Sequence, residues 1–166
     1  MKRFAILLLL LGGTAAAQVP SARPQDCSLY MIQGTYVVSY QGWMYLPAGG
    51  GYPEMQIPGV ILGVRSIRSN GTITGDATVI LPFGKAVYET TEGSFATVNA
   101  DCTGTLTRYS RVKGSLDPPS KEVDRFVCLR ETGELVVIKE ELEWGTIPMV
   151  LGSWKRMSST PDRAQW

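Results

Sequence analysis

The sequence of 166 residues contains no histidine. Histidine is the side chain best suited to proton transfer near neutral pH, and it is a common zinc ligand. Its absence excludes Ser-His-Asp and Cys-His nucleophile activation, and every zinc site that needs an imidazole. Catalysis by carboxylates, tyrosine, lysine or arginine stays open, but the composition favours a protein that is not an enzyme. We expect no cofactor and no bound metal.

The sequence also lacks a charge of one dominant sign. Lys and Arg number 16, Asp and Glu number 15, and the net charge is +1. A chain this close to neutral exerts no long-range attraction on nucleic acids or anionic membranes. After the N-terminal segment, no apolar run approaches the roughly 20 residues that a membrane helix needs. We therefore expect no nucleic-acid partner and no membrane insertion of the mature chain, while the oligomeric state stays open.

The start of the chain has the pattern of a secretory signal peptide. Lys2 and Arg3 precede an unbroken apolar run over residues 4–11, and three alanines follow at positions 15–17. Such a run is too short to span a bilayer as a helix, and small residues are what signal peptidase accepts. We predict a signal peptide over residues 1–17 and a secreted or periplasmic location.

The remaining chain divides into three parts. Residues 18–33 contain prolines and no periodic pattern, which indicates an N-terminal tether. Residues 34–157 carry strand patterns throughout and are long enough for one core, so we predict a single β domain there. Residues 158–166 resemble a flexible tail.

Strand patterns begin at the start of the β domain. Tyr36, Val38 and Tyr40 alternate with polar or smaller residues, which is typical of a strand with one buried face. Further on, Asn70-Gly71 predicts a hairpin with a type I′ turn, in which both central residues have positive φ.

The chain shows about eight such strand patterns and no helical one. Consecutive strands joined by short turns would leave two long unpaired edges in an open sheet, and closing the sheet into a barrel removes them. We therefore predict an all-β fold, a closed antiparallel up-and-down barrel of about eight strands. A two-sheet β-sandwich is the alternative.

Residues 42–58 interrupt these patterns with three prolines and the run Gly49-Gly50-Gly51, so we expect an irregular loop there. The loop is rich in aromatic residues and methionine, which suit an apolar ligand at a barrel mouth. The same side chains would also pack as a satellite cluster on the outer wall. Together with two inward tyrosines, the predicted ligand-binding residues are Tyr36, Tyr40, Trp43, Tyr45, Tyr52 and Met55.

The mature chain has three cysteines, so an exported protein would form one disulfide and keep one thiol. Cys27 lies just before the first strand pattern, and Cys102 lies in a turn between two strand patterns. A Cys27–Cys102 bridge would tie the tether to one end of the barrel, and we favour it. A Cys102–Cys128 bridge between neighbouring strands is the alternative, and Cys128 would otherwise be a buried thiol.

Three segments of the chain resemble a family of exported bacterial proteins of unknown function: "CSLYMIQGTY", "SNGTITGDATV" and "GSFATVNADCTGTLT". The resemblance runs from Cys27 to about Leu151, and its most specific part is the stretch from Asp101 to Thr105. The family is similar in pattern to lipocalin-like barrels of the allene oxide cyclase type. The resemblance implies a barrel and a Cys27–Cys102 disulfide, but no defined activity. The aromatic 42–58 segment and Cys128 depart from the family pattern.

Several charged residues are further candidates. Glu141 and Glu143 share a strand face, and a buried glutamate could act as an acid or base, but a solvated face balanced by Lys139 is the favoured interpretation. Arginines at positions 65, 125 and 130 could bind a ligand carboxylate, although a surface location is favoured for them.

Three functions follow as hypotheses. The leading one is a barrel that binds a small apolar or amphiphilic molecule. The second is a cofactor-free enzyme of cyclase or isomerase type that uses a buried Glu or Tyr. The third is a structural or partner-binding protein with a solid barrel. A reachable cavity would separate the first two from the third.

Overall fold

The computed structural model describes residues 26–46, 48, 53–142 and 148–157. The predicted signal peptide, the first part of the tether and the tail lie outside these residues. The described chain forms one short helix and nine strands. They are α1 (Leu29–Ile32), β1 (Gly34–Leu46), β2 (Met55–Ile67), β3 (Ile73–Leu81), β4 (Gly84–Thr90), β5 (Phe95–Val98), β6 (Thr103–Val112), β7 (Ser120–Leu129), β8 (Glu134–Leu142) and β9 (Pro148–Arg156).

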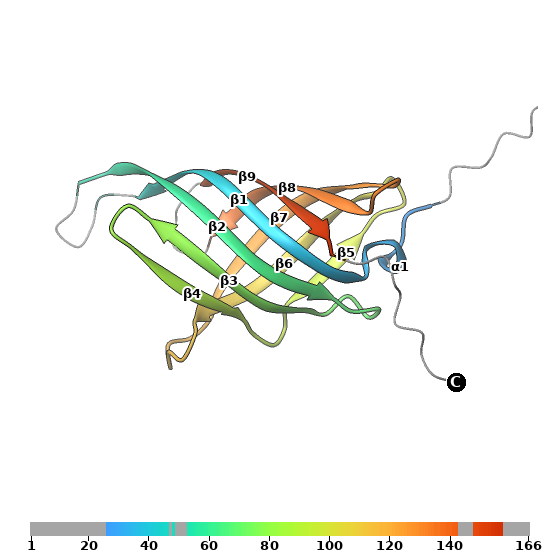
Figure 1. Ribbon diagram of the computed structural model, residues 1–166, viewed down its shortest axis with the longest axis horizontal. Helices are drawn as coiled ribbons and strands as arrows, with labels where there is room; N and C mark the ends of the chain where they lie inside the picture. Colours follow the sequence, from blue (N-terminus) through green and yellow to red (C-terminus); the bar gives the residue numbers. More distant parts are fainter. Residues whose placement is uncertain (1–25, 47, 49–52, 143–147, 158–166) are drawn as a thin grey trace, which may run out of the picture.

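The strands form a closed antiparallel barrel, which confirms the predicted fold class and excludes the sandwich. Their order is β4-β3-β2-β1-β9-β8-β7-β6, and pairing of β4 with β6 closes the ring of eight. Figure 1 shows the strands wrapping obliquely around a common axis. Both β4 and the short β5 pair with β6, β4 along residues 110–112 and β5 along residues 104–107. A turn that contains Gly93, whose φ is +83°, separates β4 from β5. Among the described strands, ring closure pairs the two edges that an open sheet would expose.

Side chains of alternating strand residues fill the barrel. On β1, Tyr36, Val38 and Tyr40 are buried, whereas Val37 between them is 44% exposed. Trp154 of β9 is also fully buried and pairs in register with Val38. The predicted inward face of the first strand is therefore confirmed.

The hairpin between β2 and β3 differs in detail from the predicted type I′ turn. Of the two central residues, only Gly71 has positive φ, at +85°. The Gly71 N–H donates to the Arg68 carbonyl oxygen at 2.9 Å, and the Arg68 N–H donates to the Thr72 oxygen at 2.9 Å. The turn is therefore one residue longer, with a single left-handed position, which is a common three-residue hairpin.

The expectation of an irregular loop over residues 42–58 was wrong for most of its length. β1 continues to Leu46, β2 begins at Met55, and these two residues pair with each other. Pro58 is tolerated within β2 because β3 pairs with β2 only from Val60 onward. A proline at a strand position with a free edge loses no ladder hydrogen bond. In Figure 1 this β1–β2 hairpin extends beyond the other strands.

The N-terminal segment covers one end of the barrel, where Figure 1 places α1. A disulfide joins Cys27 to Cys102 with Cα atoms 5.0 Å apart, and Cys128 is a free buried cysteine. The predicted pairing is therefore confirmed and the Cys102–Cys128 alternative is excluded. Ile32 of α1 is fully buried, and its carbonyl oxygen accepts a hydrogen bond from the Tyr36 hydroxyl at 2.6 Å.

The turn that carries Cys102 is stabilised by short polar side chains. The Asp101 carboxylate accepts hydrogen bonds from the Thr103 N–H at 3.0 Å and from the Thr103 hydroxyl at 2.6 Å. Such hydrogen bonds support tight turns. Cys102 itself has φ of +71°. Gly104 of β6 allows β5 to approach closely, because a Cβ at Gly104 would lie 2.1 Å from the Thr97 oxygen. This motif therefore serves the architecture.

Candidate functional site

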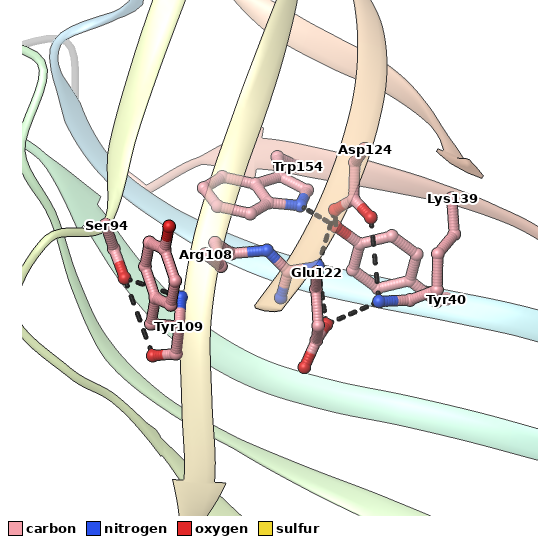
Figure 2. A network of polar contacts seen from close by, with 8 residues as sticks. All are labelled: Tyr40, Ser94, Arg108, Tyr109, Glu122, Asp124, Lys139 and Trp154. Atoms are coloured by element: carbon pink, nitrogen blue, oxygen red, sulfur yellow. Dashed lines mark hydrogen bonds and ion pairs between the residues drawn. The ribbon is translucent and has the colours of Figure 1, made fainter. Parts of the chain in front are cut away.

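Four charged side chains meet inside the barrel and are called here the interior charge cluster: Arg108, Glu122, Asp124 and Lys139 (Figure 2). Arg108 Nη2 lies 2.6 Å from Asp124 Oδ2 and 3.0 Å from Glu122 Oε2. Lys139 Nζ lies 2.5 Å from Glu122 Oε2 and 3.6 Å from Asp124 Oδ1. Arg108 is 1% exposed and Asp124 is 0% exposed. Charges buried this deeply are tolerated only when they are paired and hydrogen-bonded.

Two aromatic side chains extend the hydrogen bonding of the interior charge cluster. The Tyr40 hydroxyl donates to Asp124 Oδ2 at 2.6 Å, and Trp154 Nε1 donates to the Tyr40 oxygen at 2.7 Å. The Arg108 guanidinium and the Lys139 ammonium each lie 5.8 Å from the Tyr40 ring centroid. Tyr40 therefore links the cluster to the apolar core.

Strand alternation explains why these charges point inward. On β6, Arg108 lies two residues from Leu106, which is fully buried. On β7, Asp124 lies two residues from buried Phe126, and on β8, Lys139 lies two residues from buried Val137. Asp124 pairs directly with Lys139, next to a register shift between Val123 and Asp124. A bulge of this kind re-aims side chains within a sheet.

The environment fixes the protonation of Glu122 and Tyr40 at neutral pH. Burial raises the pKa of Glu122, but attraction to Lys139 and Arg108 outweighs burial and lowers that pKa to about 2. Burial and the neighbouring Asp124 raise the pKa of Tyr40 well above its usual value. Glu122 is therefore ionised and Tyr40 protonated at neutral pH, so neither is poised to exchange a proton there.

The Glu122 interactions predict a specific loss of stability in acid. The pKa of Glu122 is lower in the folded chain than its usual 4.5, so its stabilisation is complete above about pH 4.5. The contribution of Glu122 to the free energy of unfolding decreases by about 3 kcal/mol as the pH falls to 2. We expect Glu122→Gln to remove this part of the pH dependence, as measured by urea unfolding between pH 2 and 6.

Glu140→Gln is the matched control for this prediction. Glu140 lies on the outer face of β8 and pairs with exposed Arg125 at 2.6 Å. Exposed ion pairs contribute less than about 1 kcal/mol. An unchanged acid profile in Glu122→Gln, or an equal change in Glu140→Gln, would show that the Glu122 contacts do not set the acid stability.

Another inward charge, Arg65 of β2, lies outside the cluster. It is 2% exposed, and its guanidinium lies 5.8 Å from the Trp154 ring centroid. Within the described part of the chain, its Nε and Nη1 atoms have no hydrogen-bond partner. The same holds there for Thr90 Oγ1 and Arg108 Nε. The barrel interior therefore contains more hydrogen-bond donors than its described residues satisfy.

The predicted ligand-binding residues occupy different places. Tyr36 and Tyr40 point into the barrel, and their hydroxyls are hydrogen-bonded to Ile32 and Asp124. Trp43 is 50% exposed on the outer wall. Met55 begins β2 and is half-buried, while the Tyr45 side chain and Tyr52 lie outside the described residues.

Trp43 borders a shallow, open depression of about 540 Å³ on the outer wall. The depression is lined by Gln41, Gly42, Trp43, Pro58, Gly59, Val60, Ile80, Leu81 and Pro82. Tyr36 and Tyr40 are buried inside the barrel and are absent from this lining. The structure therefore does not bring Trp43 and the two tyrosines into one site.

The charged residues that were further candidates also lie in different places. The surface location favoured for Arg65 was wrong, because Arg65 is buried. Lys139, which was expected to balance a solvated face with Glu141 and Glu143, is buried as well. Arg125 and Arg130 are exposed, and Arg130 Nε donates to Cys102 Sγ at 2.9 Å. Glu141 belongs to β8, but its side chain and all of Glu143 lie outside the described residues.

Sequence reasoning missed Arg108, Glu122 and Asp124 altogether. Each has the same strand parity as neighbouring buried apolar residues, and that parity was the signal available.

Comparison with known proteins identifies no family for this chain. No protein-family model matches the chain, and neither a curated protein nor a solved structure matches it. The resemblance to an exported bacterial family therefore stays a prediction. Among the described residues, no helix has the length and apolar character needed to cross a membrane.

Proposed function

We propose that the barrel binds a small amphiphilic molecule, which enters from the end opposite α1. The observation that carries this proposal is the difference in exposure between the two ends of the inner wall. At the end near α1, the side chains of Ile32, Tyr36 and Leu135 are fully buried. The disulfide holds the N-terminal segment against this end. A ligand would therefore use the other end.

Towards the other end, inward apolar side chains are partly exposed. Register places Ile61, Val79 and Ala86 on the same face as buried Tyr40, and all three are half-buried. Tyr88, two residues beyond Ala86, is also half-buried. We call Ile61, Val79, Ala86 and Tyr88 the inner apolar wall. An apolar wall beside a polar floor is a common arrangement in small-molecule sites.

Glycines add room beside the inner apolar wall. Gly42 pairs with Gly59, two residues beyond the Tyr40–Ile61 pair along both strands. Both positions belong to the inward face, where a side chain would otherwise occupy the lumen. An eight-stranded barrel has an interior suited to one small ligand when its side chains do not fill it.

The alternative functions have less support. For the enzyme, Glu122 and Tyr40 do not hold the protonation states that acid–base catalysis near neutral pH needs. For the solid barrel, complete burial of the inner wall is expected, and Ile61, Val79 and Ala86 do not follow it.

Filling the lumen tests the proposal. We expect Ala86→Trp to abolish uptake of amphiphiles, because the indole would occupy the space beside the inner apolar wall. The measurement is native mass spectrometry after incubation with a mixture of fatty acids, fatty alcohols and lysophospholipids. Val87→Trp is the control, since Val87 is the next residue along β4 and is exposed on the outer wall.

A discrete added mass in the wild type and in Val87→Trp, but not in Ala86→Trp, supports the proposal. A bare wild-type mass with every class of amphiphile contradicts it. Equal uptake by folded Ala86→Trp would place the ligand elsewhere.

A further inference from the structure

We propose that the amphiphile is a monocarboxylic acid, and that Arg65 binds its carboxylate inside the barrel. This inference rests on the proposed function, because it names the chemical class of the ligand. It is carried by a charge inside the barrel that the described residues leave without a counterion.

The inward charges do not balance. Arg108 and Lys139 are both paired with Glu122 and Asp124, so two cations and two anions satisfy one another. Two further inward cations remain, Arg156 and Arg65. Arg156 donates to the Met31 carbonyl oxygen and to the Tyr36 hydroxyl. Arg65 is more deeply buried, and among the described residues no carboxylate lies within ion-pair distance of it. Arg65 is therefore a buried cation whose charge no described carboxylate neutralises.

Arginine cannot remove this imbalance by losing a proton. Its guanidinium stays charged under all conditions in which proteins fold. An unpaired charge at 2% exposure is unfavourable unless an anion or water satisfies its donors. The Trp154 ring at 5.8 Å supplies a cation–π contact, but Nε and Nη1 still lack acceptors within the described chain. A carboxylate oxygen would supply an acceptor for one of these donors and would compensate the buried charge.

A second donor lies on the same row of the barrel wall. Arg65 pairs with Gly75, and Gly75 pairs with Thr90, whose buried hydroxyl also has no partner among the described residues. Gly75 contributes no side chain between them. Its φ is +123°, and a Cβ there would lie 2.3 Å from the Val64 oxygen, so the close approach of the two backbones excludes a side chain at this position. The row therefore combines a cation, a position without a side chain and a hydroxyl.

A ligand with one negative charge suits these surroundings. The interior charge cluster pairs two cations with two anions, so it supplies no free cation to a second negative charge on the ligand. The inner apolar wall provides a surface for a hydrocarbon chain or ring. A medium- or long-chain monocarboxylate meets both conditions.

The test compares matched ligands and matched variants by isothermal titration calorimetry. The ligands are dodecanoate, dodecanol and acetate, and the variants are Arg65→Met and Arg68→Met. Arg68 is exposed in the neighbouring turn and serves as the control. We expect dodecanoate to bind the wild type and Arg68→Met equally, and Arg65→Met about 10- to 100-fold more weakly, as for loss of a charge-assisted pair.

Unliganded Arg65→Met supplies an independent readout. We expect it to unfold at the same or a higher temperature than the wild type, because it removes an uncompensated buried charge. A large drop in its unfolding temperature would show that Arg65 is already paired within the chain, and would overturn the inference.

The ligand series separates the two proposals. Equal binding of dodecanoate and dodecanol, unaffected by Arg65→Met, overturns the carboxylate inference and leaves the amphiphile proposal standing. If acetate bound as tightly as dodecanoate, the result would support a carboxylate site at Arg65 but contradict the proposal that the ligand is an amphiphile. No binding of any of the three overturns the carboxylate inference, and the broader mixture tested by mass spectrometry then decides the proposed function.

Discussion

Replacement of Asp124 by asparagine is expected to lower the free energy of unfolding by roughly 3–5 kcal/mol. Asp124 is fully buried and accepts hydrogen bonds from the Tyr40 hydroxyl and Arg108 Nη2 through the same oxygen. Asparagine keeps the shape of the side chain but removes the charge. Arg108 then remains buried with Glu122 alone, which also binds Lys139. The measurement is equilibrium urea unfolding at neutral pH.

A surface substitution of the same kind is the control. Asp76 pairs with Lys113 at 2.5 Å, but both side chains are exposed, so Asp76→Asn is expected to cost less than about 1 kcal/mol. The double variant Arg108→Met/Asp124→Leu should be less destabilised than the sum of its two single variants, because it leaves no unpaired charge. Additive losses in this cycle would show that the pair does not act as a unit.

Removal of the disulfide is expected to have an effect of similar size. The bridge between Cys27 and Cys102 closes a loop with a sequence separation of 75. The chain-entropy model assigns such a loop about 4 kcal/mol of stabilisation. We expect the Cys27→Ser/Cys102→Ser variant to unfold at a temperature lower by roughly 10 °C, as measured by circular dichroism. Amides of residues 29–33 should also exchange hydrogen faster, because α1 then loses its covalent anchor.

The third cysteine supplies the control for this prediction. Cys128 is buried and free, so Cys128→Ala should keep the disulfide and lose little stability. Dithiothreitol should destabilise both the wild type and Cys128→Ala, but not the double serine variant. If dithiothreitol had no effect on the wild type, or if α1 kept its slow exchange without the bridge, the disulfide would not be what anchors the N-terminal segment.

The barrel and the turn that carries Cys102 were predictable because their signals are local. Alternation on β1 gave the inward face of Tyr36, Val38 and Tyr40, and the same alternation elsewhere gave the number of strands. Cys102 was expected in a turn between two strand patterns, and the structure confirms this turn. Each of these signals depends on a few neighbouring residues.

The interior charges were harder to predict, because on β2 the alternation is ambiguous. Val60, Leu62 and Val64 lie on the outer wall, while Arg65 faces the lumen. An apolar outer face and an inward arginine reverse the usual pattern, so the sequence alone favours the wrong face for Arg65. Only closure of the ring shows which face is inside.

Long-range pairing decides the rest of the cluster. Arg108 and Asp124 are 16 residues apart, and Tyr40 and Asp124 are 84 residues apart. No short motif joins them, and the register shift beside Asp124 is a property of two paired strands. The irregular loop expected over residues 42–58 failed for a related reason: pairing with β1 holds Pro58 in a strand that its own sequence disfavours.

The most direct test of the account is a nuclear magnetic resonance titration of the ¹⁵N-labelled protein with dodecanoate. It follows the side-chain Nε–H signal of Arg65 and the indole Nε1–H signal of Trp154. The account predicts that both shift together, with nuclear Overhauser contacts from the chain methylenes to Ile61, Val79 and Tyr88. Changes confined to the Trp43 indole and to Val60 and Ile80 would place the ligand in the outer depression and contradict a site inside the barrel.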